Sequence, residues 1–244
     1  MDPKEFDVFA EEYRLSHERI LGASGESPEF FHEYKVRDVA RVLGSSPARR
    51  LAILDFGCGI GNSLPFLRRQ FSDCELTGID VSPRSLEIAG QRFPDIARLV
   101  LYDGNGPLPF PSASFDVVFA ACVFHHIPAA EHLRLFREWA RVLKPAGSAF
   151  VFEHNPFNPL TVRAVNMCEF DEHAVLLRPG RLTSLLEEAG LRDANCRFRI
   201  FFPHALRFLR PVEHYLTWLP LGAQYLVSAR NPWNPPSAAP LFNP

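Results

Sequence analysis

Residues 51–62 read LAILDFGCGIGN and join an apolar run to a glycine-rich turn. The run ends at Asp55, and glycines follow at every second position as Gly57, Gly59 and Gly61. Glycine costs roughly 0.5–1 kcal/mol relative to alanine in regular structure, so three so close together need a reason. One reason would be a tight strand-to-helix turn. The other would be a ligand that lies against the backbone, where no Cβ atoms obstruct it and the next helix offers unpaired N–H groups.

Short apolar runs and helical patterns alternate on both sides of this turn. The predicted strands are RRLAILDFG, CELTGIDVS, ARLVLYDG, the start of FDVVFAACVFHHI and the run after KPAG; the predicted helices are NSLPFLRRQF, PRSLEIAGQRF and AAEHLRLFREWARVL. Such alternation indicates a parallel sheet that is covered on both faces and joined by right-handed crossovers. We therefore predict a doubly wound α/β fold whose ligand lies outside the carboxyl ends of the strands.

The two ends of the chain add further elements. Two helices are expected between residues 3 and about 43, the second starting near Ser27. Towards the other end, RLTSLLEEAGL predicts a helix that ends at Gly190, and RDANCRFRIFF and LGAQYLVSAR predict strands. The predicted organisation is a helical segment at 1–44, a main domain at 45–230 with an apolar insert at 203–220, and a proline-rich tail at 231–244.

Composition places the chain among ordinary globular proteins. Of 244 residues, 47% are hydrophobic and 22% charged, with a formal net charge of −2, which gives no electrostatic sign of nucleic-acid binding. The five cysteines include no CxxC pair, which argues against a disulfide framework or a structural zinc site. The acidic N-terminus lacks the plan of a signal peptide, and no apolar run approaches the ~20 residues of a membrane span. A cytoplasmic protein is expected.

Two more acidic residues end the next two predicted strands. Asp80, in LTGIDVS, is placed where an adenosine ribose would present two hydroxyls to a carboxylate. It could instead cap the following helix, but Ser82 is the better candidate cap, which would leave Asp80 available to a ligand. Asp103 and Gly104, in LVLYDGN, combine a carboxylate with an exposed N–H and match the edge of adenine, although the pair is also common in turns.

Together these motifs resemble class I S-adenosylmethionine-dependent methyltransferases of type 11/12. The resemblance rests on LDFGCGIGN, GIDVS, LYDG, FDVVFAACVFHHI and RVLKPAG, and covers residues from about 51 to 155. It implies a Rossmann-like sheet of seven strands, mostly parallel, with an antiparallel last strand that LGAQYLVSAR fits. It also implies that the N-terminal helices form a lid and that S-adenosyl-L-methionine is the cofactor.

The resemblance further assigns roles to the strand ends. The glycine turn would hold the methionine end of the cofactor, the second strand end its ribose and the third its adenine, while the fourth would face the methionine portion. The implied residues are Asp55, Gly57, Cys58, Gly59, Asp80, Val81, Asp103, Gly104 and Ala121. The glycines then serve to clear space for the cofactor on the backbone.

Two other classes of protein stay open. A nicotinamide-dependent dehydrogenase also has a glycine turn and a downstream acid, but usually as G-x-G-x-x-G, and the third glycine here comes one residue early. Such an enzyme has no need for the Asp103-Gly104 pair or for KPAG. A protein that binds the cofactor without catalysis would keep the three acids and have a blocked acceptor pocket.

Candidates for the chemistry occur in VFHHIP, after the fourth predicted strand. Imidazole has an ordinary pKa near 6.5, so His125 or His126 could take a proton from a hydroxyl acceptor. They could equally shape the pocket or cap the next helix, and at most one is expected to face the acceptor. His154, Asn155 and Tyr13 are candidate acceptor contacts. No metal site is predicted, because no carboxylate or cysteine completes a recognisable spacing with the histidine pair.

The apolar insert at 203–220 bears on the acceptor. It could pack on the sheet, line a pocket for an aromatic or lipid-like acceptor, or rest on a membrane surface, although it has only two basic residues, Arg207 and Arg210. The chain resembles bacterial relatives of quinone-biosynthesis O-methyltransferases and lacks the N/D-P-P-Y/W signature of nucleic-acid amino-methylating enzymes. We expect a monomer or homodimer that methylates a hydroxyl of a phenolic, quinol, sugar or lipid-like small molecule, with no nucleic-acid partner.

Overall fold

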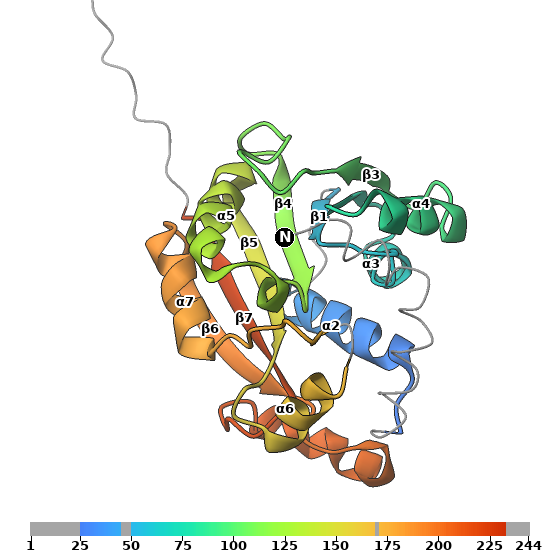
Figure 1. The fold of residues 1–244 in the computed structure, drawn as a ribbon, viewed down its shortest axis with the longest axis vertical. Helices are drawn as coiled ribbons and strands as arrows, with labels where there is room; N and C mark the ends of the chain where they lie inside the picture. The colour runs from blue at the N-terminus through green and yellow to red at the C-terminus, as the bar shows by residue number, and fades with distance from the viewer. Residues whose placement is uncertain (1–24, 45–49, 169–170, 233–244) are drawn as a thin grey trace, which may run out of the picture.

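The computed structural model describes residues 25–44, 50–168 and 171–232 (Figure 1). The first predicted helix, Tyr13 and residues 233–244 lie outside these ranges. The strands are β1 (Ala52–Phe56), β2 (Glu75–Asp80), β3 (Arg98–Leu101), β4 (Phe115–Ala121), β5 (Leu143–His154), β6 (Arg192–Arg199) and β7 (Gln224–Arg230). The helices are α2 (Pro28–Leu43), α3 (Leu64–Gln70), α4 (Pro83–Arg92), α5 (Ala129–Val142), α6 (Pro159–Asn166) and α7 (Pro179–Glu188), with the 3-10 helices η2 (Phe124–His126) and η4 (His204–Tyr215).

The seven strands form one sheet in the order β3-β2-β1-β4-β5-β7-β6. β1 pairs in parallel with β2 and β4, and the parallel pairing continues to β3 and β5. β7 is antiparallel to both of its neighbours, β5 and β6. The predicted doubly wound, mostly parallel sheet with an antiparallel last strand is confirmed.

Helices cover both faces of the sheet, so the central strands are buried on both sides. Along β4, Val117 and Phe119 belong to a core with α2 and α3, whereas Val118 and Ala120 belong to a core with α5 and α7. Figure 1 shows α5 and α7 on one side of the sheet and α2, α3 and α4 on the other. The near-continuous apolar strands of the sequence are the consequence of this three-layer arrangement.

Helix starts follow the capping chemistry of the sequence. Ser27 caps α2 and Ser82 caps α4, each followed by a proline at the first helical position, as predicted from the sequence. The sequence reading missed α6, although Asn158 caps it before Pro159 in the same way. Within the described ranges, no helix combines the length and the apolarity that a membrane span needs.

The apolar insert does not pack into the core. No residue of η4 is buried, and the side chains of Phe208, Tyr215 and Trp218 are 71%, 69% and 72% exposed. Of the three roles considered for the insert, packing on the sheet is therefore wrong for these side chains. Polar contacts hold the insert instead, because the Glu213 carboxylate accepts from the N–H groups of Phe201 and Phe202 at 3.0 Å.

Candidate active site

A cleft opens at the carboxyl ends of β1, β2 and β4, where a doubly wound sheet places its ligand. All the predicted cofactor-binding residues and one of the two predicted catalytic histidines line it. These residues are Asp55, Gly57, Cys58, Gly59, Asp80, Val81, Asp103, Gly104, Ala121 and His126. His125, His154 and Asn155 do not line the cleft.

The glycine turn combines tight packing with open space. A Cβ on Gly57 would lie 2.6 Å from the Val123 side chain, and one on Gly61 would lie 3.1 Å from the Ala89 Cβ. A Cβ on Gly59 would meet no atom of the described residues within 4 Å. All three glycines have positive φ angles, of 71°, 51° and 81° in chain order. Two glycines are thus required by their neighbours, and Gly59 leaves room at the cleft.

The Asp80 carboxylate is hydrogen-bonded to two backbone N–H groups, although the sequence had suggested that it would be available to a ligand. One carboxylate oxygen accepts from the Gly59 N–H at 2.8 Å, and the other accepts from the Ser82 N–H at 2.9 Å. Ser82 is nonetheless the helix cap, since its hydroxyl accepts from the Ser85 N–H at 2.9 Å. A carboxylate has about four lone-pair sites, so these bonds fix Asp80 and still allow it to accept from a ligand.

Asp55 is buried at the end of β1, with 2% of its surface exposed. Burial raises the pKa of its carboxyl from 3.8 to about 8; the negative charge of Asp80 adds to the rise and Lys35 opposes it. Its Oδ2 atom has no hydrogen-bond partner among the described residues. A buried oxygen without a donor is costly, so this position is suited to a ligand that brings a positively charged donor.

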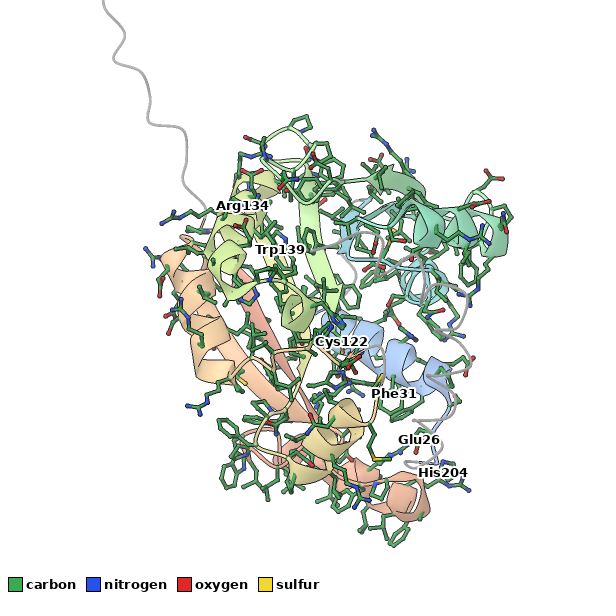
Figure 2. The ribbon with its side chains drawn as sticks, in the orientation of Figure 1. Glu26, Phe31, Cys122, Arg134, Trp139 and His204 are labelled. Carbon is green, nitrogen blue, oxygen red and sulfur yellow. The ribbon has the colours of Figure 1, made fainter. Side chains whose placement is uncertain are left out.

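A turn after β3 forms the third side of the cleft. The Asp103 carboxylate accepts from the Asn105 N–H at 2.9 Å, and Gly104 has a φ of 81°. The Arg134 guanidinium, from α5, donates to the Gly104 carbonyl at 2.9 Å and also to the Gly106 carbonyl (Figure 2). Arg134 therefore fixes a turn that lies far from it in the sequence.

His125 is buried and belongs to a network with two carboxylates. Its Nδ1 lies 2.5 Å from Glu153 Oε2, and its Nε2 lies 3.5 Å from Asp171 Oδ1. The other Glu153 oxygen accepts from the N–H groups of Val123 and Phe124. Burial by itself would lower the pKa of His125, but Glu153 and Asp171 outweigh it and raise that pKa to about 10.

His126 is the histidine that lines the cleft. Burial and the neighbouring His125 lower its pKa to about 3, against the opposing effect of Asp171 and Glu153. An imidazole with so low a pKa holds an abstracted proton poorly at neutral pH. This weighs against His126 as a general base and leaves the second role considered from the sequence, that of shaping the pocket.

Helix α2 places a buried lysine against Cys122, which is a residue of the cleft. Lys35 is 3% exposed, and its Nζ lies 3.6 Å from the sulfur of Cys122, which lines the cleft beside α2 (Figure 2). Burial would raise the pKa of the Cys122 thiol, but Lys35 and His154 outweigh it and lower that pKa to about 7. Cys122 also has a φ of 60°, an uncommon conformation for a residue with a side chain.

The two predicted acceptor contacts at the end of β5 differ in their surroundings. The His154 ring lies 5.2 Å from the His125 ring. Asn155 is fully buried, and its amide donates to the carbonyls of Pro220 at 3.1 Å and Gly222 at 2.7 Å. The structure therefore places Asn155 where it ties the end of β5 to the segment before β7.

Other cleft residues were missed from the sequence. Tyr102 and Cys122 lie within the motifs LYDG and FDVVFAACVFHHI but were not singled out, whereas the residues from α2 and α5 reach the cleft only through tertiary packing. The missed residues are His32, Ser63, Tyr102, Cys122, Glu131 and Arg134.

Comparison with known proteins identifies the domain around this cleft. Residues 54–151 match the family model described as a methyltransferase domain. The chain carries a class I methyltransferase domain. S-adenosyl-L-methionine is the cofactor of this class. The matched region contains the glycine turn, all three strand-end carboxylates and both histidines of η2.

Relatives of this methyltransferase domain include enzymes named for small-molecule acceptors. Demethylmenaquinone methyltransferase of Thermotoga maritima is 33% identical over 153 residues, which cover 63% of this chain and 61% of that protein. 27-O-demethylrifamycin SV methyltransferase of Amycolatopsis mediterranei is 37% identical over 121 residues, which cover 47% of this chain and 43% of that protein. The similarity thus spans less than two thirds of the length of either relative.

Solved structures share the fold of this chain. A SAM-dependent methyltransferase from Archaeoglobus fulgidus superposes with a TM-score of 0.61 at 18% identity, covering 82% of this chain and 94% of that one. At this identity the likeness concerns the fold, and it supports the seven-stranded arrangement over most of the chain.

The residues of the cleft fit S-adenosyl-L-methionine. Asp55 Oδ2 has no donor among the described residues, and the methionine end of the cofactor carries an ammonium group. Gly59, in the turn that follows Asp55, leaves space for a ligand against the backbone. Asp80 and Asp103 stand at the ends of the next two strands in order, which matches a ligand that extends across the sheet.

Proposed function

We propose that this chain transfers a methyl group from S-adenosyl-L-methionine to a hydroxyl of a small molecule of phenolic, quinol, sugar or lipid-like class. The observation that carries the proposal is the buried Asp55 oxygen, which has no donor among the described residues and lies beside the open Gly59, in line with Asp80 and Asp103. The names of the relatives, which include quinone, hydroquinone and rifamycin methyltransferases, support a small-molecule acceptor.

In this proposal each strand end holds one part of the cofactor. Asp55, with Gly57, Cys58 and Gly59, holds the methionine end, where the carboxylate pairs with the ammonium group. Asp80 accepts from the ribose hydroxyls, and Val81 packs against the adenine. Asp103 accepts from the adenine amino group and the Gly104 N–H donates to the ring. The Ala121 carbonyl faces the methionine portion.

The bound cofactor supplies a methyl group that its sulfonium already activates. The chain mainly has to bind both reactants in line and exclude water, and such positioning can contribute roughly 7–11 kcal/mol in favourable cases. His126 lines the cleft and is the residue we assign to contact with the acceptor. Tyr13 and His154 remain candidate contacts for the acceptor.

Turnover with a radiolabelled methyl group tests this function. The full chain is incubated with the labelled cofactor and a panel of phenols, quinols, sugars and hydroxylated lipids, and the extracted acceptor is counted. Labelled product with at least one acceptor class, lost in Asp55→Asn, is the expected result. Cofactor binding without product for any class would instead favour the non-catalytic binding protein.

A further inference from the structure

We propose that His125, His126 and Asp171 form a binding site for one divalent transition-metal ion, for which zinc is the ion to test. Each of the three offers one ligand atom, and these atoms all lie within 4.8 Å of one another. His125 and His126 come from η2, whereas Asp171 follows α6 much later in the chain. The fold thus brings together three candidate ligands that the sequence spacing did not reveal, and the proposal departs from the sequence prediction of no metal site.

The separations suit a shared ion better than direct hydrogen bonds. Asp171 Oδ1 lies 3.5 Å from His125 Nε2 and 3.4 Å from His126 Nε2. An N–H···O hydrogen bond usually measures about 2.9–3.0 Å. Ligands bound to one tetrahedral zinc at about 2.0–2.2 Å lie roughly 3.3–3.5 Å apart. Both separations from Asp171 agree with that geometry, and the ligand atoms of the two imidazoles lie within 4.8 Å of each other.

Glu153 provides the support that a metal-bound histidine needs. It pairs with His125 Nδ1 at 2.5 Å, which directs Nε2 of the same ring towards Asp171. Its second oxygen accepts from the backbone N–H groups of Val123, at 3.1 Å, and Phe124, at 2.7 Å. A carboxylate on the far nitrogen fixes the tautomer and orientation of a ligating imidazole, and strengthens it as a ligand.

Charge and ligand type select the class of ion. The two negative charges of Glu153 and Asp171 balance the two positive charges of a divalent ion. Both imidazoles bind the ion in their neutral form, so binding displaces to solvent the proton that His125 holds between the two carboxylates. Magnesium and calcium take oxygen ligands, whereas a site with two imidazole nitrogens and one carboxylate oxygen suits zinc and its neighbours. Three protein ligands leave a fourth position open, as in catalytic zinc sites.

The position of the site gives the ion a role at the cleft. The His125 side chain is 1% exposed, whereas those of His126 and Asp171 are each 11% exposed, and His126 lines the cleft. A hydroxyl acceptor bound at the open position would lose its proton more readily, because a bound metal ion lowers the pKa of a coordinated oxygen. This role rests on the proposed methyl transfer, whereas the metal site does not.

Calorimetric titration of the full chain with zinc chloride, after removal of metals with a chelator, tests the site without any cofactor. We expect one ion to bind per chain. His126→Ala and Asp171→Asn should each weaken binding at least tenfold, whereas His173→Ala, an exposed histidine two positions from Asp171, should leave it unchanged. Cobalt substitution adds a spectroscopic readout, since a nitrogen- and oxygen-bound Co²⁺ ion gives visible absorption that both ligand variants should lose.

Circular dichroism identifies any variant that has not folded, and His126→Asn replaces His126→Ala if that variant is unfolded. The absence of zinc binding to the folded wild-type chain would overturn the proposal. Unchanged affinity in folded Asp171→Asn would do the same, because the carboxylate would then serve only in a hydrogen-bond network. Loss of binding in Cys122→Ser, with affinity retained in the histidine variants, would assign the ion to the thiol instead.

Discussion

Three aspartates end three neighbouring strands, yet each has a different environment. Asp55 is buried with an oxygen that lacks a donor among the described residues, Asp80 accepts two backbone N–H groups, and Asp103 is exposed at a turn. Their positions could be predicted from the sequence, because the carboxyl ends of parallel strands meet at one edge. Their environments could not, because the partners come from other elements.

Asp55 should couple cofactor binding to proton release. Its pKa of about 8 means that the carboxyl is mostly protonated at pH 7, and pairing with an ammonium group would favour the ionised form. Binding of S-adenosylhomocysteine at pH 7 should therefore release a proton. The binding enthalpy should differ between phosphate and Tris buffers in proportion to their ionisation enthalpies, and Asp55→Asn should remove the difference. Equal enthalpies in both buffers would show that Asp55 does not pair with the ammonium group.

The same carboxyl should affect the stability of the chain without ligand. Its pKa is raised in the folded state, so the folded chain holds this proton more tightly than the unfolded chain does. The contribution of Asp55 to the free energy of unfolding should therefore fall as the pH rises from about 4 to about 8. Urea unfolding of wild-type and Asp55→Asn protein across that range measures the contribution, and parallel pH profiles for the two proteins would contradict it.

Two glycines of the turn offer a matched pair of substitutions. Gly57→Ala would place a Cβ 2.6 Å from the stiff side chain of Val123, so it should lower the free energy of unfolding by about 2–4 kcal/mol from overpacking and from its positive φ. Gly59→Ala meets open space and should cost only about 1–2 kcal/mol. Gly59→Ala should nevertheless weaken cofactor binding at least tenfold, because its Cβ would occupy space at the cleft. Urea unfolding and calorimetry separate the two effects, and retained cofactor affinity in Gly59→Ala would count against backbone contact there.

At the scale of elements, local chemistry predicted where α2 and α4 begin. Ser27-Pro28 and Ser82-Pro83 start α2 and α4 because serine side chains satisfy N–H groups that the first turn leaves unpaired. Asn158-Pro159 carries the same signal before α6, and it was overlooked because the segment has no long apolar period. Cleft residues such as Arg134 had no comparable signal, since their partners lie on distant elements.

The contact between α5 and the turn after β3 should control cofactor affinity. Arg134→Ala removes the donors to the Gly104 and Gly106 carbonyls, so the turn that presents Asp103 should loosen. We expect about tenfold weaker binding of S-adenosylhomocysteine, or about 1.4 kcal/mol, with little change in melting temperature. Arg137→Ala, an exposed arginine on the same helix, is the control. Equal affinities for the two variants would mean that the turn is rigid without Arg134.

At the scale of the molecule, the order of apolar runs was enough to predict a sheet covered on both faces. Two features could not be predicted in this way. Phe208 and Trp218 are exposed although their apolarity suggested packing, and the contacts of the insert with the sheet include hydrogen bonds from the Phe201 and Phe202 N–H groups to Glu213. Asp171 joins the histidine pair only through the fold, since no sequence period connects a residue after α6 with residues after β4.

The most direct test of whether the cleft binds S-adenosyl-L-methionine is calorimetric titration of the full chain with S-adenosylhomocysteine. We predict binding with a dissociation constant on the order of micromolar, none for NADH, and a marked loss of affinity in Asp80→Ala with the fold retained. Asp73→Ala, an exposed aspartate just before β2, should bind like the wild type. The absence of binding heat with S-adenosylhomocysteine would contradict cofactor binding at the cleft. Equal affinity in the wild type and Asp80→Ala would do the same.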